Sequence, residues 1–211
     1  MPETVSHPLF ARFYERLAPA MEKQGGAEHR EELLAGLTGR VVEVGAGVGS
    51  NFKHYPAGVT EVIAVEPESR LRASAERAAA EAAVTVRVVD GVAGELPVQD
   101  GSCDAAVASM VLCSVPDPAA ALAEFHRVLK PGGELRFYEH VLAHHAGFAR
   151  YQGLVDPVWK RLFGGCRVNR DTEAAISAAG FTVDSARRFR FPPGNAPMPA
   201  APHVIGIAHR S

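Results

Sequence analysis

Five short runs of β-branched and small apolar residues recur in the first two thirds of the chain, and they constrain its fold more than any other feature. The runs span residues 41–44, 62–65, 84–89, 105–108 and 134–138. Such runs predict strands, and the intervals between them leave room for helices. Strand–helix–strand crossovers place successive strands parallel, so the sequence predicts an α/β fold with a doubly wound, Rossmann-like sheet.

Two of the intervening segments carry an apolar stripe with helical spacing. The stripes consist of Leu71, Ala75, Ala78 and Ala82, and of Leu122, Phe125, His126 and Leu129. Asp117 and Pro118 precede the second stripe, where they supply an N-cap and a proline in the first helical position. Both segments are therefore predicted to be helices packed on the sheet.

The regular alternation of strands and helices does not extend to the segments before and after this core in the sequence. Residues 1–39 are predicted to form a helical lead-in that caps the core and breaks at Gly25-Gly26. We expect the core domain to span residues 40–211, with an irregular lid insertion near residues 142–166. A helix near residues 172–179 and strands near residues 181–189 and 203–208 complete the prediction, a mostly parallel seven-stranded sheet with an antiparallel last strand.

The composition is that of one ordinary globular protein, with 211 residues, 47% of them apolar, and a net charge of −2. That charge makes nucleic acid an unlikely partner, and no apolar run is long enough to suggest a membrane partner, so we expect a cytoplasmic protein. Three cysteines without a C-x-x-C pair favour a reducing compartment and give no zinc-ligand spacing, so no metal is predicted. The oligomeric state is not predictable from the sequence.

The strongest local signal is the glycine-rich segment 43–49, Glu-Val-Gly-Ala-Gly-Val-Gly, at the end of the first core strand. Glycines at a strand-to-helix turn let the backbone turn sharply and approach a ligand closely. The dinucleotide fingerprint needs glycine at position 50, where this chain has Ser50. Glu66 follows the second strand, where doubly wound nucleoside binders place an acid that accepts hydrogen bonds from the ribose hydroxyls.

Taken together, VEVGAGVG, Glu66, GELP, DGSCDAAV and RVLKPGGEL resemble class I S-adenosylmethionine-dependent methyltransferases, including those that methylate quinone precursors. The segments GVGSNFKHYP, MVLCSV, RFYEHV, VDPVWKRLFGGC and APHVIGIA resemble, more narrowly, the thiol S-methyltransferases of the methyltransferase-like group known from animal microsomes. The membrane anchor of those enzymes is not recognised in this sequence. The resemblance implies methylation of a small molecule, with S-adenosyl-L-methionine as cofactor and S-adenosyl-L-homocysteine as product.

The resemblance also implies the residues that contact the cofactor. Gly45, Gly47 and Gly49 match the glycines around its methionine part, Glu43 matches the acid near its amino group, and Glu66 matches the ribose acid. The rest of the predicted cofactor site consists of Tyr14 from the lead-in, Val92 and Ala93 beside adenine, and Met110 and Val111 after the fourth strand.

Leu112, Cys113, Tyr151 and Trp159 are the predicted acceptor-binding residues. Cys113 is interpreted as a buried pocket wall rather than a catalytic thiol, because nothing basic is visibly placed to lower its pKa. His140 ends the fifth strand, where open α/β sheets bind ligands, and is the candidate catalytic residue, as a positioning group or a base, with a structural histidine as the alternative.

The sequence alone leaves more than one class of methyl acceptor. A thiol ionises more readily at neutral pH than a phenol, so a sequence without an obvious base favours S-methylation of a small apolar thiol. The alternative is C- or O-methylation of a quinone-like or other aromatic metabolite. Arsenite methylation is disfavoured because the cysteines show no soft-metal arrangement. A non-catalytic cofactor-binding regulator and a nicotinamide oxidoreductase are the remaining classes.

Overall fold

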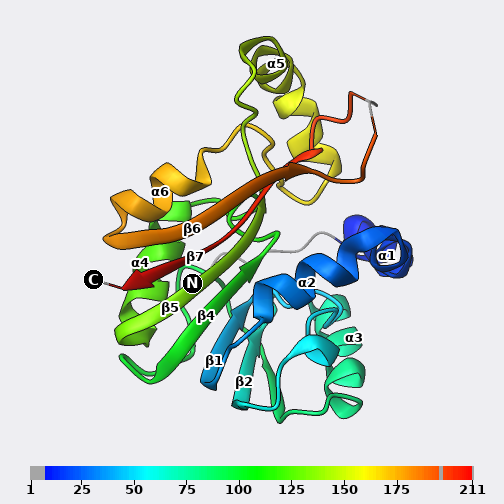
Figure 1. Cartoon of the computed structure of the whole chain (residues 1–211). Helices are drawn as coiled ribbons and strands as arrows, with labels where there is room; N and C mark the ends of the chain where they lie inside the picture. Colours follow the sequence, from blue (N-terminus) through cyan, green and yellow to red (C-terminus); the bar gives the residue numbers. More distant parts are fainter. Residues whose placement is uncertain (1–7, 195–196, 211) are drawn as a thin grey trace.

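The predicted strands form one seven-stranded sheet in the order β3-β2-β1-β4-β5-β7-β6 (Figure 1). The structure is a computed structural model that describes residues 8–194 and 197–210. Strands β1 to β5 pair in parallel, and β7 lies antiparallel between β5 and β6. The fold expected from the sequence is therefore confirmed. The strands are β1 (Gly39–Val44), β2 (Val59–Val65), β3 (Val86–Val89), β4 (Cys103–Ser109), β5 (Leu129–His140), β6 (Phe181–Arg190) and β7 (Pro202–Arg210).

Both faces of the sheet are covered, because alternate residues of each inner strand enter two different hydrophobic clusters. On β1, Val42 and Val44 join the cluster that contains Leu122 and Phe125 of α4 (Pro118–Val128). Val41 joins the opposite cluster, which contains Leu34 of α2 (Ala27–Leu34). Burial on both faces explains why the strands read as continuous apolar runs.

The helices on the faces begin at local signals in the sequence. The carboxylate of Asp117 accepts hydrogen bonds from the N–H groups of Ala119 and Ala120, so it caps α4 as predicted. Helix α3 spans Ser69–Ala80, and α6 spans Thr172–Ala178. The two predicted stripes extend slightly past their helices, because Ala82 lies two residues beyond the end of α3 and Leu129 already begins β5.

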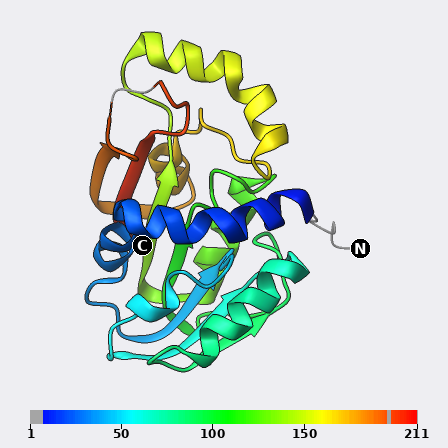
Figure 2. The ribbon, with the colours of Figure 1, turned by 90° about the vertical axis from the view of Figure 1, so that its right-hand side faces the viewer.

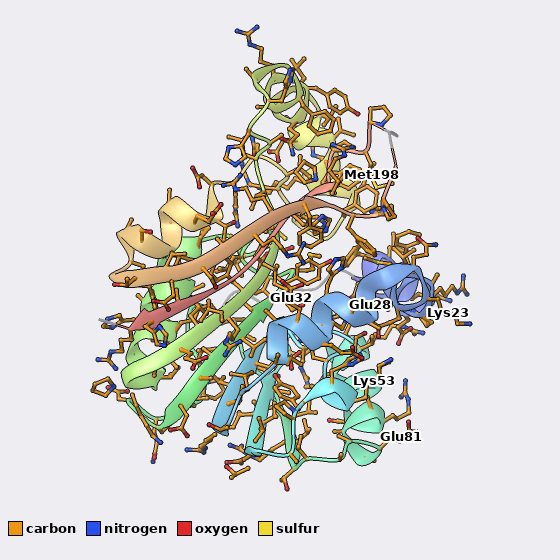
Figure 3. All side chains as sticks on the ribbon, in the orientation of Figure 1. Lys23, Glu28, Glu32, Lys53, Glu81 and Met198 are labelled. Carbon is orange, nitrogen blue, oxygen red and sulfur yellow. The ribbon has the colours of Figure 1, made fainter. Side chains whose placement is uncertain are left out.

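The lead-in is helical and changes direction at a glycine. It consists of α1 (Pro8–Met21), a single wide turn η1 (Glu22–Gly26) and α2 (Ala27–Leu34), and Gly25 has a φ of +113° between them. Residues 1–7 of the predicted lead-in lie outside the described residues. Figure 2 shows α1 crossing over the end of the sheet at which β1 and β4 finish. Glu32 of α2, labelled in Figure 3, forms an ion pair with Arg187 of β6.

The segment near residues 142–166, expected to be irregular, instead contains α5 (Ala146–Leu162), the longest helix among the described residues. That expectation was wrong because Pro157 and the glycines near it disrupt the helical signal, whereas buried contacts hold the helix together. Gln152 is fully buried, and its amide donates to the carbonyls of Val141, Val168 and Pro199. In Figure 1 this helix projects beyond the end of the sheet. Within residues 8–194 and 197–210, no helix is both long and apolar enough to cross a membrane.

Candidate functional site

The parallel strands all end at one edge of the sheet, here called the carboxyl edge, and the glycine segment begins there after β1. Gly45, Gly47 and Gly49 have φ angles of +67°, +59° and +80°. These angles belong to the left-handed region, which glycine occupies without steric cost. The chain therefore turns at this point in a way that other residues would resist. A short 3₁₀ turn, η2 (Phe52–His54), follows the segment.

The three glycines differ in what surrounds them. A Cβ atom at Gly47 would lie 3.2 Å from the ring of Tyr14 on α1, and one at Gly45 would lie 2.5 Å from a methyl group of Val111. At Gly49 a Cβ would instead meet Phe52 and Ala78. Gly45 and Gly47 thus face two other predicted cofactor residues, while Gly49 allows the turn to pack against the helical layer.

Glu66 stands at the carboxyl end of β2 and is 5% exposed. Its two carboxylate oxygens accept hydrogen bonds from the N–H groups of Gly47, at 2.7 Å, and Glu68, at 3.0 Å. Burial raises the pKa of Glu66, and the two N–H donors oppose that rise. Because each carboxylate oxygen has a second lone pair, Glu66 can accept further hydrogen bonds from a ligand beside the glycine segment.

Glu43 lies inside a polar network beneath the same segment. Its carboxylate accepts hydrogen bonds from the amide of Asn51, at 2.9 Å, and the hydroxyl of Tyr55, at 2.7 Å. Arg30 of α2 donates to Asn51 and to Ser109. Burial raises the pKa of Glu43 to about 7, in spite of these donors and the positive charge of Arg30. Arg30 is a site residue that the sequence did not predict.

The chain after β3 makes a tight turn at the carboxyl edge. Val92 and Glu95 form an isolated antiparallel bridge, and the Glu95 N–H donates to the Val92 carbonyl at 3.1 Å. Ala93 is partly buried against the hydrophobic cluster of the α4 face. That Val92 and Ala93 lie beside adenine stays a prediction.

The exit from β4 is a conformationally unusual turn. Met110 has a φ of +61°, which is uncommon for a residue other than glycine. The turn that follows is held by Glu139, whose fully buried carboxylate accepts hydrogen bonds from the N–H groups of Val111, Leu112 and Cys113. Burial raises the pKa of Glu139, and the three N–H donors oppose that rise. The only sequence signal for Glu139 is an acid within an otherwise apolar strand end.

Cys113 and His140, predicted from different strands, do come together, and Cys166 joins them. The sulfur of Cys113 lies 3.8 Å from that of Cys166 and 3.5 Å from Nδ1 of His140, which is 3.4 Å from the Cys166 sulfur. The sequence did not predict this grouping of two thiols and an imidazole, because contacts between distant segments, and not spacing in the sequence, create it.

The surroundings of this group raise the pKa values of both Cys113 and His140. Contact with Cys166, together with burial, raises the pKa of the Cys113 thiol, and His140 offsets this only in part. Burial lowers the pKa of His140, but Cys113 and Glu139 outweigh burial and leave that pKa above its ordinary value. A thiol with a raised pKa is a poor nucleophile, which agrees with the interpretation of Cys113 as a pocket wall.

Tyr151 and Trp159, the other two predicted acceptor residues, lie on α5. The Tyr151 hydroxyl donates to the Pro197 carbonyl, and Trp159 stacks on Phe163 with ring centres 3.9 Å apart. The buried Trp159 Nε1 has no hydrogen-bond partner within the described residues. Asp156 accepts from the Val168 N–H, which assigns its buried carboxylate to packing of α5.

Comparison with known proteins agrees with this geometry. A family model described as a methyltransferase domain matches residues 42–137. Human thiol S-methyltransferase TMT1B is 34% identical, over 83% of this chain and 73% of its own length. Human thiol S-methyltransferase TMT1A is 32% identical, over 94% of this chain and 85% of its own. A solved S-adenosylmethionine-dependent methyltransferase from Mesorhizobium loti has a TM-score of 0.65 at 21% identity and covers 89% of this chain and 98% of its own.

The fold and the matched domain define a class I S-adenosylmethionine-dependent methyltransferase, whose cofactor is S-adenosylmethionine. The glycines after β1 and the acid after β2 suit that cofactor, since the left-handed turn carries no side chain at Gly45 or Gly47 and is hydrogen-bonded to Glu66. Within this class, the chain belongs to the family of the thiol S-methyltransferases TMT1A and TMT1B.

Proposed function

We propose that this methyltransferase methylates the sulfur atom of a small apolar thiol. The observation that carries the proposal is the identity of 32% and 34% to two human thiol S-methyltransferases, across most of both chains. The structure supports it because the carboxyl ends of β4 and β5, where we place the acceptor, carry apolar side chains and thiols. Glu139, the carboxylate found there, is occupied by three backbone N–H groups.

Bound S-adenosylmethionine supplies a methyl group already activated on a sulfonium, so the protein must mainly bind, orient and exclude water. We assign the methionine part to Gly45 and Gly47, the ribose hydroxyls to Glu66 and the ammonium group to Glu43. The remaining proposed cofactor residues are Tyr14, Gly49, Val92, Ala93, Met110 and Val111.

We place the acceptor where β4 and β5 end, against Leu112, Cys113 and His140, with Tyr151 and Trp159 on α5 as its outer wall. Leu112 and Cys113 are buried, and His140 is partly exposed, so His140 is the candidate that contacts the reacting group. A charged thiol such as glutathione would bury its charges there without partners, whereas an uncharged thiol would lose little on entering.

A second candidate is methylation of an aromatic metabolite, and one observation favours it. His203 is 2% exposed, and its Nδ1 pairs with the Ala201 carbonyl, while its Nε2 has no hydrogen-bond partner within the described residues. Its ring lies 4.6 Å from that of His140 and within 6 Å of Tyr138, Phe189 and Phe191. A planar acceptor with a hydroxyl group would match such surroundings.

A paired acceptor assay tests the proposal. The purified protein is supplied with labelled S-adenosylmethionine and either benzenethiol or phenol, which differ only in the attacking atom, and the product is identified by mass spectrometry. We expect the thioether to form much faster than the aryl ether, and an uncharged thiol to exceed glutathione. Faster methylation of phenol, at oxygen or carbon, would favour the aromatic candidate, and turnover of neither class would overturn the proposal.

A further inference from the structure

Cys113, His140 and Cys166, here called the Cys2His cluster, have the geometry of three ligands around one tetrahedral metal ion. Zinc binds cysteine sulfur at about 2.3 Å and histidine nitrogen at about 2.0 Å, so a tetrahedron requires about 3.8 Å between sulfurs and about 3.5 Å between sulfur and nitrogen. The structure has 3.8 Å between the sulfurs and 3.5 and 3.4 Å from them to Nδ1 of His140. All ligand atoms lie within 4.8 Å of one another.

We propose that the Cys2His cluster binds a zinc-class soft cation through two thiolates and one imidazole. Thiolate and imidazole are ligands that Zn²⁺ prefers, whereas Mg²⁺ and Ca²⁺ prefer oxygen. Two thiolates balance the charge of a divalent ion, and binding supplies the free energy that deprotonates buried thiols. The cysteines are not joined as a disulfide.

The ligands are fixed in place by their surroundings, as metal ligands generally are. Glu139 holds the turn that carries Cys113, through three backbone N–H groups. The Arg167 N–H donates to the Cys113 carbonyl at 2.8 Å, which joins the segment of Cys166 to that of Cys113. The guanidinium of Arg170 donates to the carbonyls of Leu112 and Val115 on the same turn. The cluster is therefore preorganised and does not depend on flexible surface side chains.

The glycines of the FGGC segment explain how Cys166 reaches this position. Gly164 and Gly165 both have positive φ, at +57° and +87°, so the chain reverses directly after α5. A Cβ at Gly165 would come within 3.0 Å of the Ser114 carbonyl, which shows how closely the two segments approach. This close passage brings the Cys166 sulfur against Cys113, 53 residues away in the sequence.

A cation held by three protein ligands keeps a fourth position for water or another ligand, as catalytic zinc sites do. This last step rests on the proposed function: a thiol acceptor would occupy that position as a thiolate and release its proton to solvent. The site itself stands independently of the acceptor.

Cobalt replaces zinc in tetrahedral thiolate sites and makes them visible, so Co²⁺ is the probe. Chelator-treated protein, kept reduced with a phosphine, is titrated with Co²⁺ and then with Zn²⁺. We expect one equivalent of Co²⁺ to give a thiolate-to-cobalt charge-transfer band that Zn²⁺ abolishes. Cys166→Ser, and the double variant with Cys113→Ser, should lose at least about a hundredfold in affinity, because even outer partners of a ligand contribute ten- to a hundredfold. Cys103→Ser, which changes the buried cysteine outside the cluster, should bind as the wild type does.

The possible outcomes test the metal site and the methylation reaction separately. A wild-type protein without the thiolate band, or a double variant with unchanged affinity, overturns the site even if the variants fold poorly. An added uncharged thiol should shift the cobalt bands. An unchanged spectrum would exclude the acceptor from the fourth position, while failure of thioether formation in the paired acceptor assay would count only against the proposed function.

Discussion

At the ends of β1 and β2 the proposed cofactor groups are backbone turns and carboxylates from one stretch, residues 43–68, with Tyr14 of α1 laid against it. At the ends of β4 and β5, Cys113 and His140 of the proposed acceptor region meet Cys166, so that three separate segments form the group. The first region owes its shape to local backbone conformation, and the second to contacts between distant parts of the chain. Changes in the two regions should therefore have separable effects, and the predictions below run from the largest expected effect on cofactor binding to the smallest.

Gly47→Val should abolish S-adenosylmethionine binding and leave the fold intact. Valine resists a φ of +59°, and its side chain would press on Tyr14, so the turn would have to move. Isothermal calorimetry measures the binding, and far-UV circular dichroism checks the fold. Gly36→Val is the matched control, since Gly36 has a φ of +76° with open space around it. Retained binding in Gly47→Val would remove this turn from the cofactor site.

Glu66→Ala should weaken cofactor binding by about ten- to a hundredfold, because a hydrogen bond to a charged group contributes about 1.5 to 3 kcal/mol. The change also leaves the Gly47 N–H without its acceptor, which loosens the turn that Gly47→Val distorts. Titration calorimetry gives the dissociation constant, with the exposed Glu76→Ala as control. An affinity equal to that of the control would contradict the ribose assignment.

Glu43→Gln should make cofactor affinity independent of pH between about 6 and 7. Burial raises the pKa of Glu43 to about 7, so the wild-type carboxyl is mostly protonated at the lower pH and increasingly ionised above it. If the ionised form attracts the cofactor ammonium, wild-type affinity should rise about fivefold as pH increases over this range. Glutamine keeps the shape of the side chain but does not titrate. Equal slopes in wild type and variant, measured by calorimetry, would show that Glu43 does not face the ammonium.

The contrast between local conformation and contacts between distant segments also determines which features could be predicted from the sequence. The strands, the Asp117 cap and the turn at Gly47 depend on local signals, and the structure contains each of them. Cys166 beside Cys113 depends on a reversal at two glycines and on tertiary contacts 53 residues apart. Glu139 has no local signal for its three backbone partners. Helix α5 was mistaken for an irregular segment because tertiary hydrogen bonds, and not its own propensity, stabilise it.

Gln152→Ala tests whether the acceptor region can be damaged without the cofactor region. The Gln152 side chain accepts from the Ala143 N–H and donates to carbonyls in three segments: the end of β5, the stretch after α5, and the loop before β7. Alanine would leave these buried groups unpaired, and each such group costs about 1 to 3 kcal/mol when water cannot reach it. We expect a loss of about 3 kcal/mol in the free energy of unfolding, because relaxation of α5 recovers part of the cost.

Because Gln152 anchors α5, its loss should also raise the Michaelis constant for the acceptor. The hydrogen bonds of Gln152 involve neither the glycine turn nor Glu66, so the dissociation constant for S-adenosylmethionine should change by less than about twofold. Urea denaturation, acceptor kinetics and calorimetry on one preparation measure the three quantities, and the exposed Gln99→Ala should leave all of them near wild type. If cofactor affinity fell in step with acceptor affinity, the two regions would be one cooperative unit. The distinction between a cofactor region formed by local conformation and an acceptor region formed by long-range contacts would then fail.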